Sequence, residues 1–236
     1  MKRALLWTVT LILTLSVLTG CRDLFTTSLF TAFGRDGLGL SAATPISDLL
    51  RIARDPEGGR SDPVIAAEIL DALAGKPAIE LTTLPIDDKE TILQLAITAG
   101  LDLPAIGDAL TDLMNSDDRS ASFTAMIEAI DPGINTASIL VLLNDSDTLA
   151  NADALTLTMA TLVIVADLAS TVDPVELQQL IIEDPGAGYG TVTNPVIQQQ
   201  IEIIREALEA LDSRPQEEKD KIEFFGVNIF DLLTGA

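Results

Sequence analysis

The chain has no histidine, and its 236 residues include one cysteine, one tryptophan and one tyrosine. The missing histidine excludes a Ser-His-Asp or Cys-His catalytic set and a His/Cys zinc site. The single cysteine, Cys21, excludes a disulfide within the chain. Scarce aromatic side chains count against a sugar-binding platform or an aromatic cage for ammonium groups. We therefore expect no catalytic, cofactor-binding or metal-binding residue, and no cofactor.

Basic residues are also scarce. The chain has 14 Lys+Arg against 36 Asp+Glu, and no basic residue lies between Arg119 and Arg205. Such a surface repels phosphate backbones, so we expect no nucleic-acid partner. A basic partner or a store of cations is one functional explanation of the excess acid, but a soluble acidic surface is the simpler one.

The N-terminus has the pattern of an export signal. Lys2 and Arg3 precede an uncharged, mostly apolar run over residues 4–18, and two small residues follow. A positive start, an apolar run of this length and small residues are typical of a secretory signal peptide. The run is short for a transmembrane helix, which needs about 20 apolar residues.

Residues 18–21 (LTGC) resemble the lipobox of bacterial lipoproteins, in which an aliphatic residue, a small residue and Gly or Ala precede Cys. The resemblance covers only the first 21 residues. It implies that Cys21 receives a diacylglyceryl group on its sulfur, that the signal of residues 1–20 is removed, and that the new amine is open to acylation, for example by palmitate. Two or more acyl chains hold a protein stably on a membrane. The alternative is an ordinary signal peptide, or an uncleaved anchor, with an incidental cysteine.

The resemblance also bears on location within the cell envelope. In the family's sorting rule, an Asp directly after the lipidated Cys retains the protein at the inner membrane. This chain has Arg22 there, which favours the outer membrane in an organism with two membranes. Residues 21–44 are expected to form a lipidated tether. Removal of Lys2 and Arg3 with the signal leaves 12 basic against 36 acidic residues, a formal charge of −24.

Helix-start signals recur from residue 45 onward, about every 20 residues, as a short polar cap, a Pro, or acid in the first turn. The predicted helices begin at Pro45, Pro63, Asp87 (with Glu90 in a capping box), Pro104, Ser120, Asn135 or Thr136, Asp147 or nearby, Pro174, Pro195 and Pro215. The helix that begins near Asp147 is expected to be long and to run to about Ser170. Strand signals are few. Residues 45–236 are therefore predicted to form a single all-α domain, a compact bundle or array of about eight to ten short helices.

Two stretches predict how these helices pack. Residues 154–170 are apolar nearly all round, which predicts a helix at the centre of the bundle; as a membrane span the stretch is short and carries Asp167. Near the C-terminus, apolar residues recur at helical spacing on both sides of a break at residues 213–215. They are Ile197, Ile201, Ile204, Leu208 and Leu211, then Ile222, Phe225, Ile229 and Leu232. Two such seams predict a terminal antiparallel helical hairpin.

Acidic residues are the only abundant reactive groups. Asp145, Asp147 and Asp153 offer oxygen ligands for Ca²⁺, but the spacing lacks the Gly and the closing Glu of an EF-hand, so we interpret them as helix caps and turn formers. The glycine-rich stretch PGAGYG at residues 185–190, with Tyr189, lacks the Lys of a phosphate-binding loop and is interpreted as a connection between helices.

These observations favour a membrane-anchored envelope lipoprotein that is not an enzyme and acts through protein–protein contacts. Its partners would be the membrane, through the lipid on Cys21, and an envelope protein. Two other classes remain open. One is a helical ligand-binding lipoprotein with an apolar cavity that serves a transporter. The other is an enzyme that uses carboxylates, with or without a divalent metal.

Overall fold

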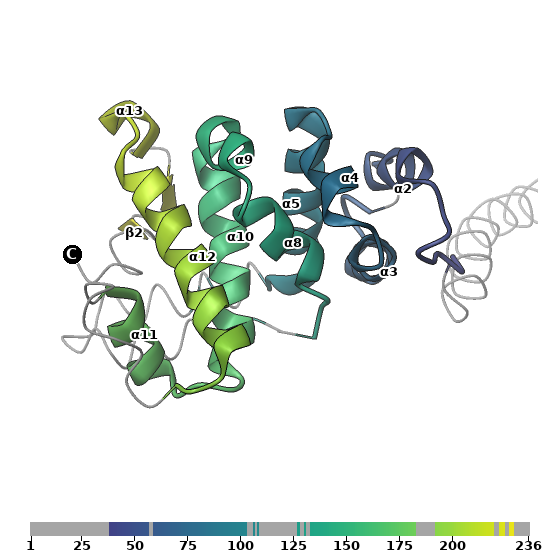
Figure 1. The fold of residues 1–236 in the computed structure, drawn as a ribbon. Helices are drawn as coiled ribbons and strands as arrows, with labels where there is room; N and C mark the ends of the chain where they lie inside the picture. Colours follow the sequence, from purple (N-terminus) through teal and green to yellow (C-terminus); the bar gives the residue numbers. More distant parts are fainter. Residues whose placement is uncertain are drawn as a thin grey trace, which may run out of the picture. The chain divides into compact units, whose positions relative to one another are not determined.

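The structure, a computed structural model, describes residues 38–56, 59–102, 133–182, 192–219, 222–224 and 227–228, together with the single residues 106, 108, 127 and 130. These residues contain ten helices and one pair of short strands (Figure 1). The elements are α2 (Ile46–Ala53), α3 (Pro63–Ala74), α4 (Ala78–Thr82), α5 (Ile86–Gly100), α8 (Ala137–Leu143), α9 (Ser146–Asn151), α10 (Ala154–Ala169), α11 (Pro174–Ile182), α12 (Pro195–Asp212), α13 (Gln216–Lys219), β1 (Glu223–Phe224) and β2 (Val227–Asn228). The predicted all-α class is confirmed.

The helix α10 lies at the centre of the unit formed by Leu40–Ala236. Thirteen of its 16 residues are buried. It packs against α5 on one side and α12 on the other, and α5 packs in turn against α3 (Figure 1). The buried hydroxyls of Thr158 and Thr161 each donate to a carbonyl one turn earlier in α10, at 2.8 Å, so they remain satisfied without water. The predicted buried central helix is confirmed. None of the described helices is long and apolar enough to cross a membrane.

Three helix starts with the sequence Asp/Asn-Pro-Val fold in the same way. Asp62, Asp173 and Asn194 each accept a hydrogen bond from the backbone N–H of the Val two residues later, at 2.9 to 3.0 Å. The Pro takes the first helical position, where its missing N–H has no partner to lose. These caps confirm the predicted starts of α3, α11 and α12. The helices α2 and α8 begin within one residue of the predicted starts, directly after Pro45 and Thr136.

The predicted capping box at Asp87 and Glu90 is wrong. Helix α5 begins one residue earlier, at Ile86, with Pro85 in the capping position and no side-chain cap. The Glu90 carboxylate instead accepts the backbone N–H of Asp153 at 2.7 Å. Glu90 therefore bonds the start of α10 and does not cap the start of its own helix, α5.

The predicted long helix from Asp147 to about Ser170 is also wrong, because two helices share this stretch. Helix α9 ends at Asn151, the backbone becomes extended at Ala152, and α10 begins at Ala154. The Asp153 side chain causes the restart by accepting the backbone N–H of Thr156 at 2.9 Å. An Asp whose side chain caps the following turn competes with continuation of the preceding helix.

The C-terminal stretch confirms one predicted seam and corrects the predicted hairpin. On α12, Ile201, Ile204, Leu208 and Leu211 are buried and Ile197 packs against the core. After the break, however, the described residues form the single turn α13, and β1 then pairs antiparallel with β2. The predicted helical hairpin is therefore replaced, in the described residues, by a helix, one helical turn and a pair of two-residue strands. Ile222 is buried.

Several predictions lie outside the described residues. These are the signal of residues 1–20, Cys21 and most of the predicted tether, the bulk of the helices expected after Pro104 and Ser120, the loop at residues 185–190, and Phe225, Ile229 and Leu232.

Candidate functional site

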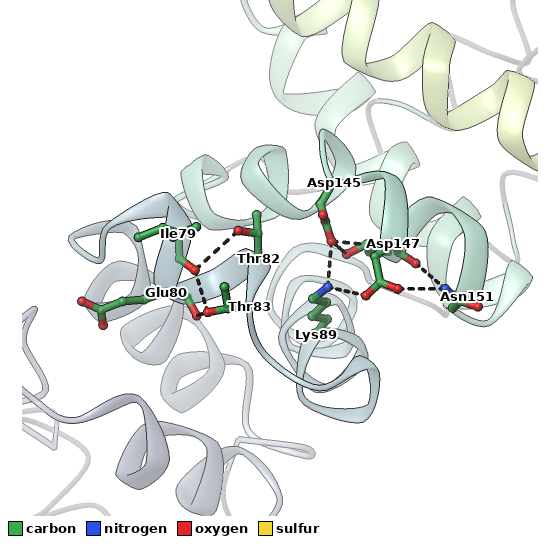
Figure 2. Close-up of polar contacts among 9 residues, drawn as sticks. Ile79, Glu80, Thr82, Thr83, Lys89, Asp145, Asp147 and Asn151 are labelled. Carbon is green, nitrogen blue, oxygen red and sulfur yellow. Dashed lines mark hydrogen bonds and ion pairs between the residues drawn. The ribbon is translucent and has the colours of Figure 1, made fainter.

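The most unusual group in the described residues is Lys89, whose side chain is 1% exposed. It extends from the first turns of α5 toward the start of α9 (Figure 2). Its Nζ donates to Asp145 Oδ2 at 2.8 Å and to Asp147 Oδ2 at 2.6 Å. A buried ammonium is costly unless it is paired and hydrogen-bonded, and here two carboxylates meet that need.

The local sequence explains why both carboxylates lie here. Asp145 caps α9, and its Oδ2 accepts both the backbone N–H of Thr148 at 3.1 Å and the Thr148 hydroxyl at 2.7 Å. Asp147 lies in the first turn of α9, where its Oδ1 accepts the Asn151 amide at 2.9 Å (Figure 2). Negative charge is favourable at a helix N-terminus, so the start of α9 stabilises both carboxylates.

The charges of this cluster reinforce one another. Burial acts to lower the pKa of Lys89, but the hydrogen bonds and charges of Asp145 and Asp147 outweigh it, and the pKa is raised above its ordinary value. Burial likewise acts to raise the pKa of Asp145, but the hydrogen bonds from Lys89 and Thr148 and the lysine charge outweigh it, and the pKa is lowered. The lysine and Asp145 are therefore held in their charged forms at neutral pH.

This state limits the chemistry available to the cluster. A lysine acts as a nucleophile or a base only when its amine is neutral, which requires a lowered pKa. Lys89 has the opposite shift and a buried ammonium. The cluster therefore joins α5 to α9, two segments that are 56 residues apart at Lys89 and Asp145, as an internal ion pair.

The three aspartates that the sequence offered as calcium ligands are accounted for separately. Asp145 and Asp153 cap α9 and α10, which confirms their interpretation as caps, and Asp147 stands in the first turn of α9. Asp145 and Asp147 meet at the Lys89 ammonium, whereas Asp153 accepts the backbone N–H of its own helix start. Among the residues that the structure describes, no group of three His, Cys, Asp or Glu side chains is arranged to hold a metal ion.

Two arginines are also used inside the fold. Arg205 is buried, and its guanidinium donates to the carbonyl of Leu180, in the last turn of α11, with an Nε–O distance of 2.8 Å. Arg214 donates to the carbonyls of Leu149 and Ala152, both at 2.7 Å, at the end of α9. Cations at helix C-termini satisfy carbonyls that have no intrahelical partner and complement the helix dipole.

Some basic side chains are therefore used for contacts within the fold, namely those of Lys89, Arg205 and Arg214, whereas Arg51, Arg54 and Arg60 are exposed. Many acidic side chains also lie at the surface. Exposed examples are Asp71, Glu80, Asp87, Glu206 and Glu209.

Sequence reasoning missed Lys89, although a signal was present. Lys89 precedes Ile92, Leu93 and Ala96 at the spacing of one helix face, and all three are buried in the core. A charged residue on the apolar face of a helix indicates a buried ion pair. The partner was not predictable in the same way, because α9 lies more than 50 residues further along the chain.

The chain was compared with models of protein families, with curated proteins and with solved structures, and no match was found in any of the three.

Proposed function

We propose that this chain is a lipid-anchored protein of the bacterial cell envelope that acts through protein–protein contacts and is not an enzyme. The observation that carries the proposal is the LTGC motif at residues 18–21, placed directly after a positive start and an apolar run. These features together make Cys21 the site of lipid attachment. Arg22 after the cysteine favours the outer membrane where the organism has two membranes.

The helical body supports a contact role in two ways. The titratable groups with shifted pKa values among the described residues, Lys89 and Asp145, are held charged in a structural ion pair and have no neutral amine or acid to offer a substrate. Lys89, Arg205 and Arg214 make contacts within the fold, and the excess of acidic over basic residues in the chain suits an exterior that stays soluble beside a membrane. The partner we propose is another protein of the envelope.

The anchor is tested by metabolic labelling with a radioactive fatty acid and by membrane fractionation. We expect the natural chain to be labelled and to remain with membranes after a high-salt wash, because two or more acyl chains hold it there. Cys21→Ser removes the only sulfur in the motif and should abolish the label. Thr19→Ala is the matched control, since it keeps a small residue at that position and should leave labelling unchanged. Persistent label on the Cys21→Ser chain would contradict the proposal.

The contact role is tested by mild crosslinking of native membranes, followed by affinity capture of the tagged chain and mass spectrometry against an untagged control. A reproducible partner at near-stoichiometric amount supports the proposal and identifies the process. If a folded, labelled chain captures none, the contact role is wrong. A small molecule that remains bound in native mass spectrometry would then favour the ligand-binding class.

A further inference from the structure

The first residues of the helical body run along α3 and are bonded to it. The backbone N–H of Leu40 donates to Glu68 Oε1 at 2.9 Å. The Lys76 ammonium, just beyond the end of α3, donates to the carbonyls of Ala42 and Thr44 at 2.7 and 2.6 Å. We call residues 40–44 the strap. The strap lies within the stretch that the sequence assigned to the tether, residues 21–44.

Gly75, directly after α3, lies in close contact with the strap. A Cβ added to Gly75 would lie 2.5 Å from the Cβ of Ala42, closer than side chains approach one another. The φ of Gly75 is −83°, which any residue adopts, so the backbone itself does not require glycine there. The need for glycine at position 75 comes from the close approach of the strap.

The chain enters the strap through a second glycine with a different role. Gly39 has a φ of 63°, in the left-handed region that favours glycine, and no atom lies within 4 Å of the position its Cβ would take. The conformation, and not crowding, is what calls for glycine at position 39. The chain therefore turns immediately before it is fastened to α3.

Few contacts hold the strap against the body. Ser41, Ala42 and Ala43 are exposed, and only Leu40 packs against the core, where it is partly buried. The hydrogen bonds described above go to the half-buried side chains of Glu68 and Lys76. Segments with few buried apolar contacts open locally at a much smaller free energy than the whole domain.

We infer that residues 40–44 are a releasable strap that sets where the membrane tether leaves the body. Docked, the strap makes the chain leave the body at Leu40, beside the middle of α3. Released, it adds its five residues to the tether, which lengthens the maximum reach by about 17 Å. The described contacts show the docked state, the released state is inferred from how few those contacts are, and the effect on a tether rests on the proposed lipid anchor.

Hydrogen exchange with mass spectrometry on the full mature chain, lipidated and held in lipid nanodiscs, tests the strap directly. Gly75→Ala introduces the crowding methyl group and should speed exchange in the peptide covering residues 38–44 by about tenfold or more, since overpacking of this kind is strongly unfavourable. Exchange within α3 and α10 should stay unchanged. The variant with both Gly75→Ala and Ala42→Gly removes the clash and should restore slow exchange.

A second variant tests the polar part of the strap. Lys76→Met keeps the side-chain stem and removes the ammonium that holds Ala42 and Thr44, so it should also speed exchange over residues 38–44. Unchanged exchange in both Gly75→Ala and Lys76→Met, or acceleration that Ala42→Gly does not reverse, would overturn the inference. The same measurements on the Cys21→Ser chain produced without residues 1–20 separate the two proposals, because strap opening does not need the lipid, whereas membrane binding does.

Discussion

Replacing Lys89 with Met is the sharpest test of how the central ion pair supports the fold. Met has a similar length and keeps the packing of the side-chain stem, so the substitution removes mainly the charge. The two carboxylates left behind differ in their surroundings. Asp145 is 16% exposed and keeps its hydrogen bonds from Thr148, and Asp147 is 59% exposed and keeps its bond from Asn151. Water and neighbouring donors therefore partly stabilise both carboxylates without the lysine.

The expected magnitude follows from which partner is left buried. Removing one member of a buried pair costs about 3–5 kcal/mol when the other is left uncompensated, so Lys89→Met should cost less, about 2 kcal/mol. Asp145→Asn leaves the lysine, the more buried partner, with one exposed carboxylate, and Asn caps a helix as well as Asp does. That change should cost about 3 kcal/mol. The double variant has no buried charge left unpaired and should cost no more than Lys89→Met alone.

The assay is urea unfolding of the non-lipidated chain, produced without residues 1–20 and with Cys21→Ser, followed by far-ultraviolet circular dichroism at neutral pH. This probe suits the mature chain, because Trp7, the one tryptophan, lies in the predicted signal. The slope of the transition should not change, so shifts of the midpoint report stability. Strictly additive losses, or a loss below about 0.5 kcal/mol for Lys89→Met, would refute the assignment of Lys89 and Asp145 as a coupled pair.

The same contacts predict the pH dependence of stability and the role of a capping arginine. Because the folded pKa of Asp145 is lowered, the carboxylate stabilises the fold above about pH 3.9, and this stabilisation is lost as the pH falls through the folded pKa. The stability of Asp145→Asn should therefore fall less steeply in acid. Because the folded pKa of Lys89 is raised, the lysine stabilises the fold below about pH 10.4, and this stabilisation is lost as the pH rises through the folded pKa. The Lys89→Met variant should therefore lack this loss of stability at alkaline pH. An alkaline stability profile identical to that of the unsubstituted chain would count against the pairing. Arg214→Met should cost about 1.5–3 kcal/mol in urea unfolding, because it removes charged hydrogen bonds to the end of α9. The control Arg51→Met breaks an exposed pair with Asp48 and should cost about 0–1 kcal/mol; equal losses in the two variants would contradict the capping role.

Local signals succeeded where the interaction that forms an element lies within a few residues. The starts at Asp62, Asp173 and Asn194 were predictable because each cap bonds a backbone N–H two residues away. The buried position of α10 was predictable because a helix that is apolar all round has no face suited to water.

Local reasoning failed where a side chain bonds a residue far away in the sequence, and where one pattern of apolar residues fits both a helix and a strand. Glu90 fits a capping box by its spacing from Asp87, yet it bonds Asp153, 63 residues away. Ile222 is spaced like a helical residue and is indeed buried, yet the residues after it pair as strands. Apolar spacing over so few residues describes a buried face without specifying the backbone that presents it.

The sequence by itself determined the class of fold, most helix starts, the central helix and the acidic charge of the chain, and it carries the whole basis for the proposed anchor at Cys21. These properties depend on local hydrogen bonds, on the period of apolar residues and on composition. Only the tertiary structure decided how the few cations are used: Lys89 between two carboxylates of α9, Arg205 and Arg214 on the ends of other helices, and Lys76 on the strap. The partner of a long charged side chain depends on which distant helices pack beside it, and the spacing of residues near that side chain does not indicate the partner.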